Sequence, residues 1–318
     1  MKQSRLLLAQ RLAFLELLIL APTAFGQQVS APVAAATKSV VQGNFEIIKD
    51  IEVGWSGTRM MHLDMILPAH PPSRPMPAVF VMHAGGWLDG SYHNSFGRGN
   101  LYSQGFAVVS IEYHAANKDA RWPVQLQDCL HAIRWVRANA SKYDIDPSHF
   151  AACGESAGAH LAACVAVYGD DPAFAAKSDH PEVSAGVQAV VLGDAPLDIL
   201  TSETNHTNPK YKWNIENLLG GTPAQNPEAW YEACMVSHVS KSLPPFFIWH
   251  GDKDNVVPID ESVRFVDALN KTGVPVEYIP VKNGGHDAFT PMDKALPIEP
   301  DGKTLVEKMT QFLERHLK

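Results

Sequence analysis

The sequence is poor in cysteine. It has four in 318 residues, and none stands in a C-x-x-C pair or beside histidines at the spacing of a metal finger. So few cysteines do not form a disulfide framework, and no metal site is predicted from them. We expect them to pack in the interior, and the sequence leaves open whether two of them pair. They are Cys129, Cys153, Cys164 and Cys234.

The sequence also lacks clustered positive charge and long apolar runs. Lys and Arg total 26 against 34 Asp and Glu, which gives a net charge of −8. Nucleic-acid binding needs a basic patch, so no nucleic-acid partner is expected. After the N-terminal region, no apolar run reaches the roughly 18 to 20 residues of a membrane span. Because 46% of residues are hydrophobic and the 22 Gly and 23 Pro are dispersed, disorder and fibrous repeats are excluded.

The N-terminus has the pattern of a secretory signal peptide. Basic residues precede an apolar stretch over 12–20, and Ala24-Phe25-Gly26 follows it. We therefore expect residues 1–26 to be a signal peptide and the protein to be exported, to the periplasm or out of the cell. Glu16 interrupts the apolar stretch and leaves a helical N-terminal extension as the alternative. Residues 27–43 have no helical or strand period and are expected to be a flexible leader to a domain over 44–318.

From residue 44 the chain alternates short β-rich runs with longer helical patterns. This alternation predicts an α/β fold, a mostly parallel central sheet flanked by helices. Residues 195–242 interrupt it with polar and aromatic residues and are expected to form a small lid-like insertion. The predicted strands are 45–53, 61–67, 78–83, 106–112, 149–153, 187–192, 246–250 and 276–281, and the predicted helices are 122–140, 157–167, 259–271 and 304–317.

One pentapeptide carries the strongest chemical signal. Gly154-Glu155-Ser156-Ala157-Gly158 lies between a predicted strand and a predicted helix. This is the G-x-S-x-G nucleophile elbow, in which serine stands on a tight strand-to-helix turn and flanking glycines let neighbouring backbone approach. A serine N-cap after a turn glycine is the structural alternative. The placement favours Ser156 as a nucleophile.

A serine hydroxyl needs a base to take its proton and a carboxylate to orient that base. The strand over 246–250 runs into Gly251-Asp252-Lys253-Asp254, and the strand over 276–281 runs into a loop that contains His286. We predict Asp254 as the orienting acid, with Asp252 as its rival, and His286 as the general base. The order Ser156, Asp254, His286 is the chain order of this kind of fold.

The same chemistry needs hydrogen-bond donors for the oxyanion that forms on a carbonyl substrate. His83-Ala84-Gly85-Gly86-Trp87 follows a predicted strand, and its glycines let the backbone turn its amides inward. We predict an oxyanion hole made by Gly85, Gly86 and the N–H of Ala157, the residue after the nucleophile. A plain turn after a strand is the alternative.

These motifs, with Glu112-Tyr113-His114 and Tyr143-Asp144-Ile145-Asp146-Pro147, resemble the α/β-hydrolase superfamily, specifically secreted carboxylesterases of the hormone-sensitive-lipase and BD-FAE type. The resemblance covers nearly all of 44–318 and implies the same triad and oxyanion residues. Two departures stand out. Ala84 replaces the first glycine of the family's oxyanion loop, and His114 stands where arginine is common. The second departure removes a fixed positive charge.

The predicted function is a serine carboxylesterase that acts through an acyl-enzyme and needs neither a metal nor an organic cofactor. The resemblance suggests short-chain or plant-cell-wall esters, such as acetyl or feruloyl groups, either as small molecules or linked to polysaccharide. Trp87, His160 and Trp213, and also Trp230, are the candidate lining residues of the substrate pocket, with packing as their alternative role. A serine peptidase or amidase of the same fold, which usually carries a further large domain, and a catalytically silent binding module remain alternatives. The oligomeric state is left open.

Overall fold

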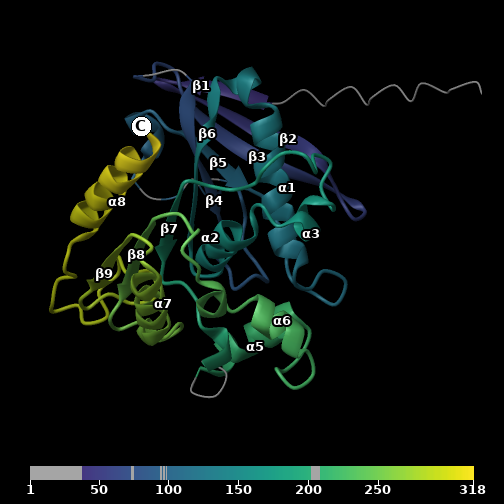
Figure 1. Ribbon diagram of the computed structural model, residues 1–318. Coiled ribbons are helices and arrows are strands. Elements are labelled where there is room, and N and C mark those ends of the chain that lie inside the picture. Colours follow the sequence, from purple (N-terminus) through teal and green to yellow (C-terminus); the bar gives the residue numbers. More distant parts are fainter. Residues whose placement is uncertain (1–37, 73–74, 94, 96, 98, 202–207) are drawn as a thin grey trace, which may run out of the picture. The chain divides into compact units, whose positions relative to one another are not determined.

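The computed structural model describes residues 38–72, 75–93, 95, 97, 99–201 and 208–318 (Figure 1). The predicted signal peptide, and all but the end of the predicted leader, lie outside these residues. The strands are β1 (Lys38–Gln42), β2 (Phe45–Ser56), β3 (Arg59–Pro68), β4 (Met76–Met82), β5 (Ala107–Ile111), β6 (Ile145–Glu155), β7 (Ala189–Gly193), β8 (Phe246–Gly251) and β9 (Val276–Val281).

The helices are α1 (Val124–Ala138), α2 (Ala157–Tyr168), α3 (Pro172–Ala175), α5 (Pro209–Leu219), α6 (Pro227–Glu232), α7 (Ile259–Thr272) and α8 (Gly302–Leu317), with 3₁₀ turns η1 (Leu101–Gln104), η2 (Ala140–Tyr143) and η3 (Met235–His238). Local sequence explains several ends. Asp301 caps α8 by accepting the N–H of Thr304, and Asn208 caps α5 ahead of Pro209. Gly273 ends α7 in the left-handed conformation.

The nine strands form one sheet in the order β1-β2-β3-β5-β4-β6-β7-β8-β9. The strands from β1 to β3 pair antiparallel, as do β3 and β5, while β5, β4, β6, β7, β8 and β9 are parallel. The order reverses around β4, because the chain passes from β5 over β4 to β6. Such a reversal leaves a crevice at the carboxyl ends of the neighbouring strands, where open α/β sheets bind ligands.

Helices cover both faces of this sheet, with α1 and α2 on one face and α8 on the other (Figure 1). Along β8, Phe246 and Ile248 pack on the α1 and α2 side, while Phe247 and Trp249 pack on the α8 side. Strands buried on both faces need continuous apolar runs, which is why the central strands could be predicted from sequence. The structure confirms the mostly parallel sheet with flanking helices.

The leader prediction needs one correction at its C-terminal end, because residues 38–42 form β1 rather than irregular chain. Their backbone pairs with β2 through a turn at Gly43, whose φ is 58°. Val40 and Val41 are 51% and 69% exposed. A strand at the sheet edge with exposed side chains needs no apolar alternation, so the pattern gave no strand signal.

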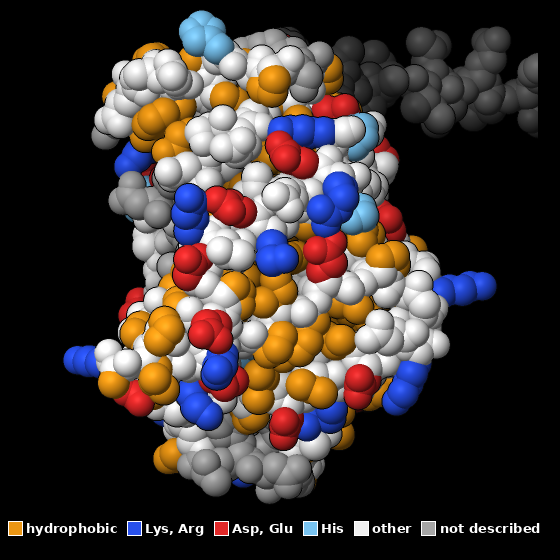
Figure 2. Space-filling model, turned by 90° about the vertical axis from the view of Figure 1, so that its left-hand side faces the viewer, with side chains coloured by type: hydrophobic (Ala, Val, Ile, Leu, Met, Phe, Trp, Pro, Cys, Tyr) orange, Lys and Arg blue, Asp and Glu red, His pale blue; other side chains and the backbone are white. Residues whose placement is uncertain are grey.

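The described part of the lid-like insertion contains α5, α6 and η3, which belong to the same core cluster as α2. All four cysteines are buried, as expected. Among the described residues, no helix combines the length and apolarity that crossing a membrane requires. On the face shown in Figure 2, charges of both signs are interspersed around a band of exposed hydrophobic side chains.

Candidate active site

Ser156 occupies a strained turn between β6 and α2. Its φ of 53° and ψ of −124° lie in a region that a residue with a side chain rarely adopts. A Cβ on Gly154 would lie 2.3 Å from the carbonyl carbon of Gly158, and one on Gly158 would lie 2.1 Å from the carbonyl oxygen of Met82. Both glycines are therefore required sterically, and the elbow packs directly on the end of β4.

In the structure, the three predicted triad residues are in consecutive hydrogen-bond contact. Nε2 of His286 is 2.9 Å from Oγ of Ser156, and Nδ1 of His286 is 2.8 Å from Oδ2 of Asp254. With its proton on Nδ1, the imidazole donates to the carboxylate and presents Nε2 to accept the serine hydroxyl proton. These residues come from the ends of β6, β8 and β9.

The acid and histidine loops meet because no side chain stands between them. A Cβ on Gly251 would lie 2.3 Å from the carbonyl oxygen of Gly285. The rival acid, Asp252, has another role, because its Oδ1 accepts the backbone N–H of Asn283 at 2.6 Å. That contact holds the turn before His286, so Asp252 has a structural role and Asp254 is the acid that contacts His286.

Asp254 is held as an anion. Burial opposes its ionisation, but hydrogen bonds from His250 and His286 outweigh this and hold the pKa of Asp254 well below its usual range. Its Oδ1 also accepts the backbone N–H groups of Val256 and Val257, at 2.7 and 3.0 Å. The carboxylate is therefore charged at every pH where a serine hydrolase would work.

The predicted oxyanion loop turns back on itself beside Ser156. Gly85 has φ 130°, a Cβ there would lie 1.9 Å from the carbonyl oxygen of Asp89, and its own carbonyl accepts the N–H groups of Leu88 and Asp89. Gly86 has φ 61°. Ala157 begins α2, so its N–H has no partner within the helix ladder. The departure at Ala84 falls outside the three donor positions.

A cavity of about 590 Å³ opens over Ser156 and His286. Of the predicted pocket residues, Trp87 and Trp213 line it, with Trp87 buried and Trp213 56% exposed. Asn214 also lines it, and sequence reasoning missed this residue because an asparagine inside an amphipathic helix carries no signal. In the described part of the chain, Oδ1 of Asn214 and Nε1 of Trp87 are buried without a hydrogen-bond partner.

His160 and Trp230 do not line this cavity, which corrects two pocket predictions. His160 is fully buried, its Nε2 lies 2.8 Å from the carbonyl oxygen of Ala233, and burial lowers its pKa to about 4. Its ring packs against the rings of Trp87 and Trp122, at centroid distances of 5.3 and 5.6 Å. One helical turn after Ser156, the side chain points into the core under the insertion. Trp230 is also fully buried and donates Nε1–H to the carbonyl of Gly221.

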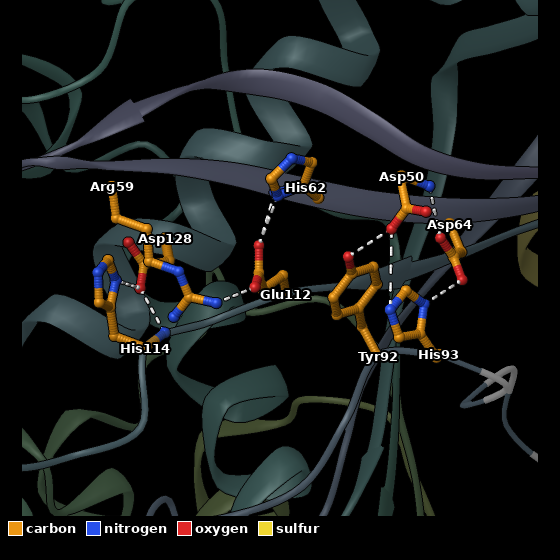
Figure 3. Close-up of polar contacts among 9 residues, drawn as sticks. All are labelled: Asp50, Arg59, His62, Asp64, Tyr92, His93, Glu112, His114 and Asp128. Carbon is orange, nitrogen blue, oxygen red and sulfur yellow. Dashed lines mark hydrogen bonds and ion pairs between the residues drawn. The ribbon is translucent and has the colours of Figure 1, made fainter. Parts of the chain in front are cut away.

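The departure at His114 is accommodated by an acid partner. Oδ2 of Asp128 lies 2.8 Å from both Nδ1 and the backbone N of His114, and this hydrogen bond raises the pKa of His114 (Figure 3). Nearby, Arg59 forms an ion pair with Glu112, which also accepts the N–H of His62 at 2.9 Å. The local charge lost by replacing arginine is therefore partly recovered when His114 is protonated.

Among the described residues, two groups of acid and histidine side chains have ligand atoms within 4.8 Å of one another. One is Asp194 with His250 and Asp254, and it shares Asp254 with the predicted triad. The other is Asp50, Asp64 and His93. In the second group His93 contacts Asp64 at 3.0 Å, and Tyr92 donates to Asp50 at 2.9 Å (Figure 3). These contacts tie the chain after the oxyanion loop to β2 and β3.

Asp194, after β7, is an unusual carboxyl. It is fully buried, has φ 49°, and accepts the N–H of Gly251 at 2.9 Å. Burial raises its pKa to about 9, and the charge of Asp254 adds to this effect. The folded state therefore keeps a proton on Asp194 at neutral pH that the unfolded state, with an ordinary carboxyl, releases.

Asp194→Asn should for this reason stabilise the protein in a pH-dependent way. Between about pH 4 and 9 the folded state binds one more proton than the unfolded state, so Asp194 makes stability fall as pH rises through this window. Asparagine keeps the acceptor for Gly251 without titrating. Unfolding midpoints of both proteins, measured from pH 4.5 to 8.5, should diverge with rising pH in favour of the variant. A difference that stays constant over this range would contradict the assignment.

Fold and site together define the class. The sheet is mostly parallel, and Ser156 lies on a strained elbow directly after the central strand β6. It faces a histidine and an acid from the loops that follow β9 and β8. This combination is typical of an α/β-hydrolase. The family model for BD-FAE matches residues 63–269, and the chain belongs to that family.

Curated relatives and solved structures agree. The chain is 30% identical over 219 residues to "Esterase LipC" and 31% identical over 234 residues to "Probable carboxylic ester hydrolase LipM", both of Mycobacterium tuberculosis. These alignments cover 68% and 72% of this chain but 54% and 53% of the relatives, so the chain spans about half of their length.

Among solved structures, "Bifunctional GH43-CE" of Bacteroides eggerthii matches with a TM-score of 0.72 at 27% identity, over 86% of this chain and 38% of that one. Esterase 2 of Thermogutta terrifontis with propionate bound matches with a TM-score of 0.65 at 25% identity, over 84% of this chain and 93% of that one.

Proposed function

We propose that this protein is a serine carboxylic-ester hydrolase that works through an acyl-enzyme. The observation that carries the proposal is the continuous contact from Ser156 Oγ through His286 to Asp254, at 2.9 and 2.8 Å, at the base of the cavity. The names of the relatives, esterases and carboxylic ester hydrolases, support the same reaction class.

The reaction has two halves. In the first, Ser156 Oγ bonds to the ester carbonyl carbon while His286 Nε2 takes the hydroxyl proton, and the oxyanion receives N–H donors from Gly85, Gly86 and Ala157. Collapse of this intermediate breaks the bond to the alcohol, which leaves with the proton from His286. In the second half, water attacks the acyl carbon while His286 Nε2 takes its proton. The bond from that carbon to Ser156 Oγ then breaks, the proton returns to Oγ and the carboxylic acid is released. Each oxyanion donor contributes about 3 to 4 kcal/mol to transition-state stabilisation.

The proposed substrates are short-chain esters or the acetyl and feruloyl esters of plant-cell-wall polysaccharide. A cavity of about 590 Å³ suits a small acyl group, and Trp213 at its wall offers an exposed aromatic face for a sugar or phenolic ring. The structure titled "Bifunctional GH43-CE", at 27% identity, supports the same substrate class.

The proposal is tested by comparing initial rates on p-nitrophenyl acetate, p-nitrophenyl butyrate and p-nitroacetanilide. We expect turnover of the esters and at least about a hundredfold lower kcat/KM on the anilide, a difference of roughly 3 kcal/mol in activation free energy. Preferential hydrolysis of the anilide would favour the amidase alternative. If all three fail and a fluorophosphonate probe does not label Ser156, the protein is a silent binding module instead.

Export is part of the proposal and rests on the basic and apolar pattern over residues 1–26. N-terminal sequencing of protein recovered from the periplasm or medium should give a chain that starts after Gly26. Recovery of the full chain in the cytoplasm alone would contradict export.

A further inference from the structure

A second histidine lies against the triad carboxylate, and the reaction above does not use it. His250 is the penultimate residue of β8, four residues before Asp254, and it is fully buried. Its Nε2 lies 3.1 Å from Oδ2 of Asp254 and 3.0 Å from the carbonyl oxygen of Val257. Its Nδ1 lies 2.8 Å from Oγ of Ser262 on α7.

These contacts select one tautomer of His250 for a ring that carries a single proton. Nε2 faces two acceptors, a carboxylate and a carbonyl, so this nitrogen carries the proton and donates it. Nδ1 is then the acceptor, and the hydroxyl of Ser262, itself fully buried, donates to it. The neutral ring therefore has a partner at both nitrogens, as a buried imidazole requires.

Oδ2 of Asp254 consequently accepts from two imidazoles, His250 Nε2–H and His286 Nδ1–H. In the described part of the chain, Asp194 also has a ligand atom within 4.8 Å of one on His250 and one on Asp254. Asp194, after β7, accepts a hydrogen bond from the backbone N–H of Gly251, the residue after His250. It therefore lies beside the Asp254 carboxylate on the β7 side.

We propose that His250, oriented by Ser262, is a positioning residue that holds the Asp254 carboxylate against His286 and limits how strongly that carboxylate stabilises the protonated form of His286. The inference rests on the proposed esterase function. A second donor on one carboxylate oxygen fixes the angle at which that oxygen meets His286. It also takes up part of the anion's charge, which weakens the attraction between that carboxylate and the imidazolium that forms when His286 takes the serine proton.

The test compares His250→Leu, which removes the donor, with His250→Gln, whose side-chain amide can donate from a position close to that of Nε2. The pH dependence of kcat and KM is measured on p-nitrophenyl acetate from pH 5 to 9. For His250→Leu we expect kcat to fall roughly ten- to a hundredfold, the usual loss for a residue that orients a catalytic group, with KM changed less than about twofold. Its acid limb should move to higher pH by about half a unit or more. His250→Gln should recover most of kcat and of the acid limb.

Two further variants keep the test decisive. Ser262→Ala removes the hydroxyl that orients the ring. We expect a smaller loss of kcat than in His250→Leu, with the acid limb shifted in the same direction. This variant tests the proposal if His250→Leu does not fold. His149→Leu is the matched control, because Nδ1 of His149 also contacts an aspartate, Asp146, at 2.8 Å, but neither residue lines the cavity over Ser156. It should leave kcat unchanged.

The outcomes separate the two proposals. If the wild type is active, two results overturn the positioning role and leave the esterase function standing. One is an unchanged acid limb in folded His250→Leu, and the other is a His250→Gln variant as impaired as His250→Leu. A wild type without ester turnover overturns the proposed function itself.

Discussion

Replacing Ser156 with alanine lowers kcat on p-nitrophenyl acetate by about 10⁴- to 10⁶-fold, the loss expected when a triad nucleophile is removed. The reason is geometric. Ser156 Oγ is the atom that faces His286 Nε2 at 2.9 Å, and alanine leaves that base without a group to deprotonate. The comparison is made on identically purified proteins whose circular dichroism and unfolding midpoints agree.

A double variant makes this prediction sharper. Since serine and histidine act as one unit, Ser156→Ala combined with His286→Ala should be no slower than Ser156→Ala alone. Full activity in Ser156→Ala would show that another residue is the nucleophile. Independent, multiplied losses in the double variant would show that the two side chains do not work together.

Gly158→Ala is the substitution for which we expect the largest loss of stability. The added Cβ would lie 2.1 Å from the carbonyl oxygen of Met82 and 2.7 Å from that of His83. Both are backbone atoms, at the end of β4 and the start of the predicted oxyanion loop. Neither can rotate away, so α2 and the end of β4 must separate. A cost of about 3 kcal/mol in unfolding free energy is expected, with loss of ester turnover because the elbow moves away from its donors.

The matched control is Gly273→Ala, at the end of α7. A Cβ there meets nothing within 4 Å, but φ is 76°, so only the left-handed backbone cost of about 1 to 2 kcal/mol applies. Urea unfolding of both variants measures the difference. Equal losses in the two variants, or wild-type ester turnover in Gly158→Ala, would contradict the tight packing at the elbow.

Much of the site could be predicted because its signals are local. The elbow pentapeptide places glycines at positions where an added Cβ would lie only 2.3 and 2.1 Å from backbone atoms. His286 and Asp254 each follow a strong strand pattern, and parallel strands end at the same edge of a sheet. The strands and long helices over 122–317 could be predicted for the same reason, since apolar runs and helical spacing reflect burial directly.

The sequence did not predict the position of side chains whose burial depends on residues far away in the chain. His160 follows the elbow by one helical turn and looked like a pocket residue, yet Ala233, far along the chain, accepts its hydrogen bond. Asn214 gained its place on the cavity wall only because α5 packs beside Gly86, where a Cβ would lie 2.3 Å from its Nδ2. No residue near either position in the sequence reveals these contacts.

The sequence by itself determined the fold class of this protein and predicted its candidate nucleophile, acid and base, because each is encoded by residues that are neighbours along the chain. Only the tertiary structure decided the strand order that reverses around β4, the edge strand β1, the exclusion of His160 from the cavity and the approach of His250 and Asp194 to Asp254. These features depend on which faces of distant segments meet, and on the desolvation that follows, which no local pattern records.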